Sequence, residues 1–169
     1  NGEAAQELWA EFRGGHPVGD DFQHLTEAIA WLARAQDSTP DGGIARGYSL
    51  VRHTEFRVRG WQPAYPETTA YIIPTLYAAA DIFNSDSLAE RAELAARWEI
   101  AVQLPSGAVR GGTMAALPSP AIFNTGQVLL GWLATLGRTD NEDYARAAMR
   151  AADYLVSVQD SDGQWRRGQ

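Results

Sequence analysis

The chain has 169 residues, enough for one domain with a buried core, and its composition is that of a folded protein. Its formal net charge of −7 argues against nucleic acid and anionic membrane surfaces as partners, because an acidic surface is not attracted to either. The absence of cysteine excludes disulfides, thiol nucleophiles and thiolate metal sites. No apolar run reaches the roughly 18 residues needed to span a membrane.

The first part of the chain predicts two helices and a long loop. Residues 4–13 are rich in helix formers, and a second helix begins at Asp20 or Asp21, either of which can cap it. The apolar stripe of that second helix consists of Phe22, Leu25, Ile29 and Leu32. The segment 37–66 is irregular, with short strand pairing expected around 48–59 because some residues there have β propensity.

The remainder alternates strongly apolar helices with amphipathic ones. Segments 68–83 and 125–136 are apolar nearly all round, which predicts burial on most sides. Segment 88–104 and the segment that ends at Gln159 are amphipathic and are therefore expected to lie outside. The expected capping boxes of these two outer helices are Ser87-Leu-Ala-Glu90 and Thr139-Asp-Asn-Glu142. This alternation indicates two concentric layers of helices.

A glutamine pattern recurs along the chain. Gln159 lies at the end of the last helix and is followed by a glycine turn and Trp165, and looser copies of this pattern surround Gln36 and Gln103. A glutamine at a helix end can hydrogen-bond to the turn beyond it and tie the two together. The step of 56 residues from Gln103 to Gln159 equals the step from Thr69 to Thr125. Two unrelated markers with one offset predict a repeating helical hairpin.

The segment from Arg150 to Trp165 resembles the Gln–Trp repeat of squalene and oxidosqualene cyclases, which also occurs in α/α-toroids generally. The resemblance implies one all-α domain over residues 1–169, made of helical hairpins in a partial or open ring of about six helices. It also implies association with the rest of a longer chain or with a second copy. The Asp-x-Asp-Asp acid of the cyclases is missing, since Asp160-Ser-Asp162-Gly lacks the last carboxylate. The zinc-ligating cysteine of protein prenyltransferases and the Cys-Gly-Glu-Gln element of thioester toroids are missing too, so no family chemistry carries over.

A second resemblance concerns the starts of the two apolar helices. The segments 61–75 and 123–133 resemble bacterial toroid proteins linked to polysaccharide synthesis and modification, whose relatives include uronate epimerases and lyases. This resemblance implies a small-molecule or saccharide ligand.

In a hairpin repeat, the loops after the outer helices and the starts of the inner helices lie at one end. Aromatic side chains there offer apolar faces to a sugar ring, amides bind its hydroxyls, and arginine binds a carboxylate. Inner-helix N-termini also favour anionic or polar ligands. The predicted binding residues are Arg46, Tyr48, Trp61, Arg110, Asn124 and Gln127.

The predicted catalytic residues are Glu67, Tyr65 and Tyr71. Glu67 stands just before an apolar helix among aromatic residues that would desolvate it and suit it to act as an acid or base. A simpler alternative exists for each residue. Glu67 can serve only to stabilise the helix N-terminus, the tyrosines can be core residues, and Asn124 can be an N-cap.

Three functions remain open at this point. The first is binding or processing of an acidic saccharide, and the second is cyclase-like action on an isoprenoid, which requires a deep apolar cavity lined by aromatics. The third is a non-catalytic scaffold, in which core side chains plug the inner-helix ends. No cofactor is expected, and no metal site either, because His16, His24 and His53 lack metal-ligand spacing.

Overall fold

The computed structural model describes residues 5–6, 9–10, 12–14 and 19–166. Residues 19–166 are mostly helical, which confirms the all-α prediction, and they include one two-stranded antiparallel sheet. The elements are α2 (Asp21–Asp37), β1 (Tyr48–Ser49), β2 (Gly60–Trp61), α3 (Pro66–Phe83), α4 (Asp86–Val102), α5 (Ile122–Leu136) and α6 (Glu142–Ser157). Of the helix predicted at 4–13, residues 4, 7, 8 and 11 lie outside the described residues, and residues 5–6, 9–10 and 12 are helical.

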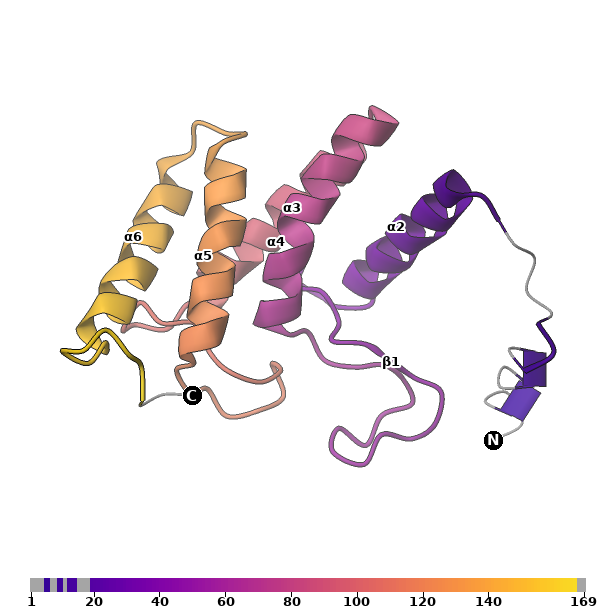
Figure 1. Ribbon diagram of the computed structural model, residues 1–169, viewed down its shortest axis with the longest axis horizontal. Helices are drawn as coiled ribbons and strands as arrows, with labels where there is room; N and C mark the ends of the chain where they lie inside the picture. Colours follow the sequence, from indigo (N-terminus) through magenta and orange to yellow (C-terminus); the bar gives the residue numbers. More distant parts are fainter. Residues whose placement is uncertain (1–4, 7–8, 11, 15–18, 167–169) are drawn as a thin grey trace.

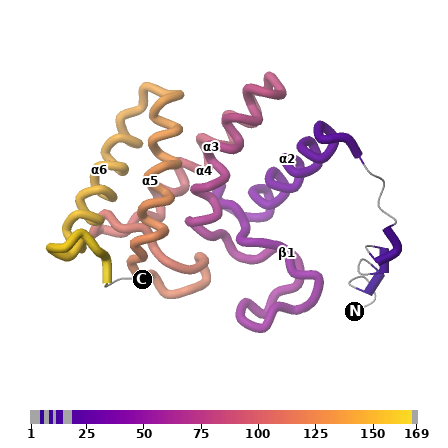
Figure 2. The backbone as a smooth tube through the Cα atoms, in the orientation of Figure 1, coloured from indigo at the N-terminus to yellow at the C-terminus, as the bar shows by residue number. Residues whose placement is uncertain are grey.

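The helices α2 to α6 are arranged in a row, with α4 behind α3 and α5 (Figure 1). α3 packs against α4 and α5, α5 packs against α6, and α2 makes a smaller contact with α3. The backbone tube shows that the loops after α2, α4 and α6 lie at one end of this row, where α3 and α5 begin (Figure 2). The loops and helix starts expected at a common end therefore lie together. In the described part, no helix combines the length and apolarity that a membrane span requires.

The tightest contact in the core is between α3 and α5. A Cβ atom added at Gly131 of α5 would lie 2.9 Å from Ile73 Cδ1 of α3, so only glycine fits without a shift. Next to it, Trp132 is fully buried, and its Nε1 donates a hydrogen bond to the carbonyl of Ala96 on α4 at 3.1 Å. Alanines 92, 95 and 96 are also fully buried, which lets the neighbouring helices approach α4 closely.

The expectation that the two apolar helices are buried on most sides is wrong. Each has one buried face and one exposed face, because among the described residues its neighbours cover only part of its circumference. The exposed large apolar side chains on these helices are Tyr71 and Ile82 of α3 and Phe123, Leu130 and Leu133 of α5.

The helix starts differ from the sequence prediction in detail. Asp20 caps α2 as expected, since its carboxylate accepts a hydrogen bond from the main chain of the first turn at 2.7 Å. The N-cap of α4 is Ser85 instead of Ser87, and the N-cap of α6 is Asn141 instead of Thr139. Both capping-box predictions were therefore wrong in position, by two residues each.

The three glutamines of the recurring pattern make the same contact. Each Nε2 atom donates a hydrogen bond to a glycine carbonyl in the turn after its helix, at 2.8 to 3.0 Å. The pairs are Gln36–Gly42, Gln103–Gly107 and Gln159–Gly163. All three glycines have positive φ, at 98°, 90° and 83°, which L residues rarely adopt. The prediction that glutamine ties each helix to its turn is confirmed at all three positions.

Two of these glutamines also reach the next helix of the α2, α4, α6 series. Gln36 Nε2 donates to the carbonyl of Arg91 on α4 at 2.9 Å, and Gln103 Nε2 donates to the carbonyl of Ala147 on α6 at 3.0 Å. Arg91 and Ala147 are 56 residues apart. One side chain therefore joins a helix, its turn and the following helix.

Two threonines make a second pair of matching contacts. The hydroxyl of Thr69 on α3 accepts a hydrogen bond from the amide of Ile44, and the hydroxyl of Thr125 on α5 accepts one from the amide of Val109, both at 2.9 Å. Each threonine thus holds the preceding loop against the first turn of its own helix. The 56-residue step found in the sequence corresponds to equal hydrogen bonds in space.

We expect Gln103→Ala to lower the free energy of unfolding by about 2–3 kcal/mol, because the carbonyls of both Gly107 and Ala147 lose a donor. Gln159→Ala is the matched control and should cost about 1 kcal/mol or less, since Gln159 is exposed and bonds only its own turn among the described residues. Urea denaturation of both variants, followed by far-UV circular dichroism, measures the difference. Equal losses would contradict a bridging role for Gln103.

Candidate functional site at the starts of α3 and α5

The loop between α2 and α3 contains an insertion. From Gln36 to Thr69 the chain advances 33 residues, whereas from Gln103 to Thr125 it advances only 22. The longer loop includes the hairpin of β1 and β2, in which Tyr48 pairs with Trp61. Strand pairing was expected here, and the structure places its second strand just beyond the predicted 48–59.

Three aromatic rings gather where this hairpin meets α2. The ring centroids of Trp31, Tyr48 and Trp61 lie 4.8 to 5.8 Å apart. Trp31 and Tyr48 remain 44% and 45% exposed, so this aromatic platform is open to solvent. The guanidinium of Arg34 lies 5.7 Å from the Trp31 ring centroid. Tyr48 and Trp61 were predicted binding residues. Trp31 was missed because in the sequence it is one more apolar residue of an amphipathic helix.

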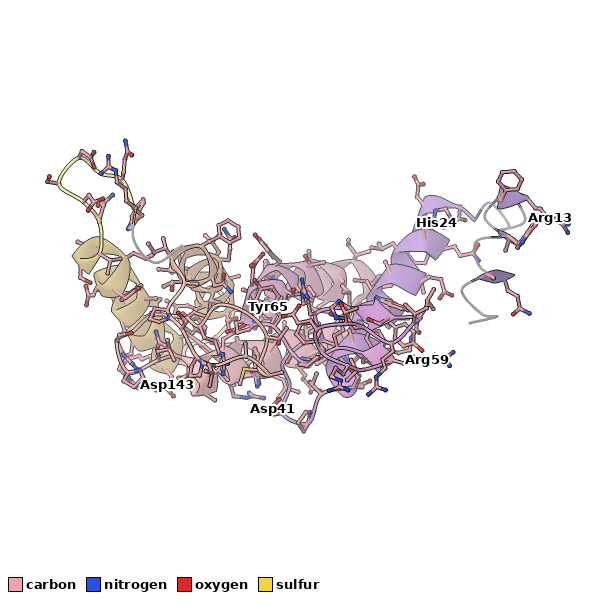
Figure 3. All side chains as sticks on the ribbon, turned by 90° about the horizontal axis from the view of Figure 1, so that it is seen from below. Arg13, His24, Asp41, Arg59, Tyr65 and Asp143 are labelled. Carbon is pink, nitrogen blue, oxygen red and sulfur yellow. The ribbon has the colours of Figure 1, made fainter. Side chains whose placement is uncertain are left out.

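A pocket of about 120 Å³ lies beside the first turn of α3. The loop before α3 and the loop between α4 and α5 both contribute to its lining. The lining residues are Arg46, Glu55, Phe56, Tyr65, Gly112 and Thr113. The Arg46 guanidinium lies 5.5 Å from the Phe56 ring centroid, a cation–π geometry that positions the charge at the pocket. Figure 3 shows this end of the molecule, with Tyr65 near the middle and Arg59 toward α2.

A hydrogen-bonded network connects the starts of α3 and α5. The Tyr65 hydroxyl donates to Glu67 Oε2 and accepts a hydrogen bond from the side chain of Asn124. Asn124 Nδ2 also donates to the carbonyl of Arg110 at 3.2 Å. Burial raises the pKa of Tyr65, and the bond to Glu67 raises it further, against the smaller opposing effects of Asn124 and Arg46. The phenol is therefore protonated at neutral pH and acts as the donor to Glu67.

The other predicted residues lie outside this network. The Arg110 side chain is buried and donates to the carbonyls of Thr113 and Ala116, so it braces its own loop. Tyr71 is 46% exposed on α3, and Gln127 is half-buried on α5. The N-cap interpretation of Asn124 is wrong, because α5 begins earlier, with Ala121 as its N-cap.

The charge of the inserted loop contrasts with that of the whole chain. Residues 46–59 contain four arginines against a single glutamate, in a protein whose formal charge is −7. The arginines are Arg46, Arg52, Arg57 and Arg59. Two of them also shape the hairpin, since Arg52 Nε donates to the carbonyl of Arg57 and Arg59 Nε donates to that of Leu50.

The histidine in this loop has a structural contact. His53 Nδ1 accepts hydrogen bonds from the amides of Glu55 and Phe56, and its ring stacks on Phe56 at 4.9 Å. Across residues 19–166 and the shorter described pieces before them, histidine and carboxylate side chains form no group of three or more that could hold a metal ion.

Comparison with protein-family models, curated proteins and solved structures finds no match for this chain. Function is therefore argued from the geometry of the chain itself.

Proposed function

We propose that the chain is an α/α-hairpin repeat of the toroid type, with α2, α4 and α6 as outer helices and α3 and α5 as inner ones. The support for this arrangement is the pair of 56-residue correspondences, in which equivalent glutamines and threonines make equal hydrogen bonds. In this arrangement, the N-terminal ends of the inner helices and the inserted hairpin form one ligand-facing end.

We propose further that this end binds an acidic saccharide. The observation that carries the proposal is the inserted loop, which combines the aromatic platform with four arginines on an otherwise acidic protein. Exposed aromatic rings supply stacking faces for a sugar, and guanidinium groups supply charge-assisted donors for its carboxylate. A pocket of about 120 Å³ is small compared with drug-sized sites, so it suits one acidic group or one ring edge.

Each group of the network has a role in this proposal. Arg46 at the pocket binds the carboxylate of the saccharide, and Tyr65 and Asn124 position Glu67. Among the described residues Glu67 Oε1 accepts no hydrogen bond, so it is the acceptor for a sugar hydroxyl. Where the bound sugar is processed, the same carboxylate is the base that takes a proton, and Tyr65 is the nearby donor.

Two alternative functions fit the site less well. An isoprenoid site requires a deep apolar cavity, whereas the pocket at the inner-helix starts presents an arginine, a glutamate and a threonine. A pure scaffold requires that core side chains plug this end, whereas Trp31 and Tyr48 are exposed there.

The test is calorimetric titration with a panel of hexuronate tetrasaccharides and with neutral hexose tetrasaccharides of the same linkages. We expect a uronate to bind and its neutral counterpart to bind at least about tenfold more weakly. Arg46→Gln should lower the affinity for the uronate by about tenfold to a hundredfold, because a charged hydrogen bond contributes about 1.5–3 kcal/mol. The affinity of the wild type should also fall as salt is added.

Arg97→Gln is the matched control, since Arg97 pairs with Glu93 on the exposed side of α4. It should leave binding unchanged. The absence of binding to every uronate, or equal losses for the two arginine variants, would refute the proposed saccharide site.

A further inference from the structure

The row of helices ends at a turn that repeats two earlier turns but lacks their covering helix. Gln36 and Gln103 each donate to their own glycine turn and to the next outer helix. Within residues 19–166, Gln159 donates only to the carbonyl of Gly163.

The three turn glycines give a second, independent sign of the same difference. A Cβ atom at Gly42 would lie 2.6 Å from Leu94 of α4, and one at Gly107 would collide with the main chain of Arg150 on α6. A Cβ atom at Gly163 would meet only the Gln159 side chain, at 4.0 Å. The first two turns are thus covered by the following outer helix, and the third is open among the described residues.

The α2 helix at the opposite end has the matching features in the same register. The carbonyls that accept from the glutamines, those of Arg91 and Ala147, lie twelve residues before Gln103 and Gln159. The residue twelve before Gln36 is His24. The residues that cover the glycines, Leu94 and Arg150, lie nine before their glutamines, and the equivalent position on α2 is Glu27.

The first half of α2 is available for such a contact. His24 and Glu27 are exposed, and α2 has only a small contact with α3. The open turn after α6 and the open side of α2 are therefore the two halves of the interface that already joins α2 to α4 and α4 to α6.

We infer that a second copy of this chain docks on the α6 turn through its α2 helix. In that contact Gln159 donates to the partner's main chain at the His24 position, and the Glu27 position of the partner passes over Gly163. The contact is heterologous, so copies join head to tail and either close into a ring or run on. This inference rests on the repeat arrangement proposed above and continues its interface.

The test is sedentation-equilibrium analysis of the wild type and of Gln159→Ala and Glu27→Trp, over a wide range of concentration. The mass of the wild type should rise with concentration above the 18.4 kDa of the monomer. Each variant should associate at least about tenfold more weakly, since one removes the donor and the other places a large ring where helix and turn must touch. Glu90→Trp, on the exposed face of α4, is the control and should associate like the wild type.

Mixing the two variants tests the head-to-tail geometry. The Gln159→Ala copy retains an intact α2, and the Glu27→Trp copy retains an intact α6 turn, so the mixture should form a one-to-one heterodimer and nothing larger. A wild type that stays monomeric, or variants that associate like it, would overturn the inference. Uronate binding by the Gln159→Ala monomer is measured in parallel, so that failure of assembly is distinguished from failure of the proposed saccharide site.

Discussion

Glu99→Leu is expected to raise the free energy of unfolding at pH 7 by about 3 kcal/mol. Glu99 of α4 is fully buried, and neither carboxylate oxygen has a hydrogen-bond partner. The equivalent positions, four residues before Gln159 and Gln36, are Leu155 and Leu32, so the site is suited to leucine. Replacing an unpaired buried acid by an apolar side chain of similar size removes its desolvation cost. Urea denaturation at pH 7 measures the change.

The stability gained should depend on pH. Burial raises the pKa of Glu99 well above its usual range, so the folded state holds a proton that the unfolded state loses above about pH 4.3. The wild type therefore has this stability in full below the unfolded pKa and loses it as pH rises toward the folded pKa. The advantage of Glu99→Leu should grow from pH 4.5 to 7.

Glu99→Gln is the matched control for this pH dependence. Its amide has nearly the shape of the carboxyl group but does not titrate, so this component of the pH dependence should disappear in it as well. A leucine variant no more stable than the wild type at pH 7 would show that Glu99 has a partner or solvent access in the folded protein.

Trp132→Ala is expected to lower the free energy of unfolding by about 3–5 kcal/mol, a large part of the roughly 5–15 kcal/mol that holds a domain together. The Trp132 ring is fully buried and donates to the carbonyl of Ala96, so its removal leaves a cavity between α5 and α4 and an unpaired acceptor. Urea denaturation followed by far-UV circular dichroism is the measurement, since tryptophan fluorescence changes with the substitution itself.

Trp31→Ala is the control for the same change in side-chain size. Trp31 is 44% exposed on the aromatic platform and should contribute only about 1 kcal/mol to folding. If both substitutions cost the same, the core does not lie between α5 and α4 as the packing indicates.

Sequence periodicity located the helices well. The apolar repeat that begins at Phe22 marks α2, and the predicted ends of α3 and α5 at Phe83 and Leu136 agree with the structure. Periodicity succeeds because an amphipathic helix must place its apolar residues on one face whatever its neighbours are. The cap positions failed because Ser85 and Asn141 cap helices whose first turns are set by the preceding loops.

The candidate site was predicted only in part. Tyr65 and Glu67 are close in sequence, and their shared location could be read from the chain. Their connection to Asn124, 57 residues beyond Glu67, depends on the packing of α3 beside α5. The role of Arg110 was misjudged for the same reason, since the loop that surrounds its guanidinium is folded back by tertiary contacts.

By itself, the sequence determined the helical class, the order of strongly apolar and amphipathic helices, and the 56-residue correspondence, because these depend on local residue spacing. The tertiary structure alone decided which faces of α3 and α5 stay exposed, that Glu99 is buried without a partner, and that Trp31 joins Tyr48 and Trp61. These properties depend on which helix lies beside which, and burial is set by neighbours that are distant along the chain.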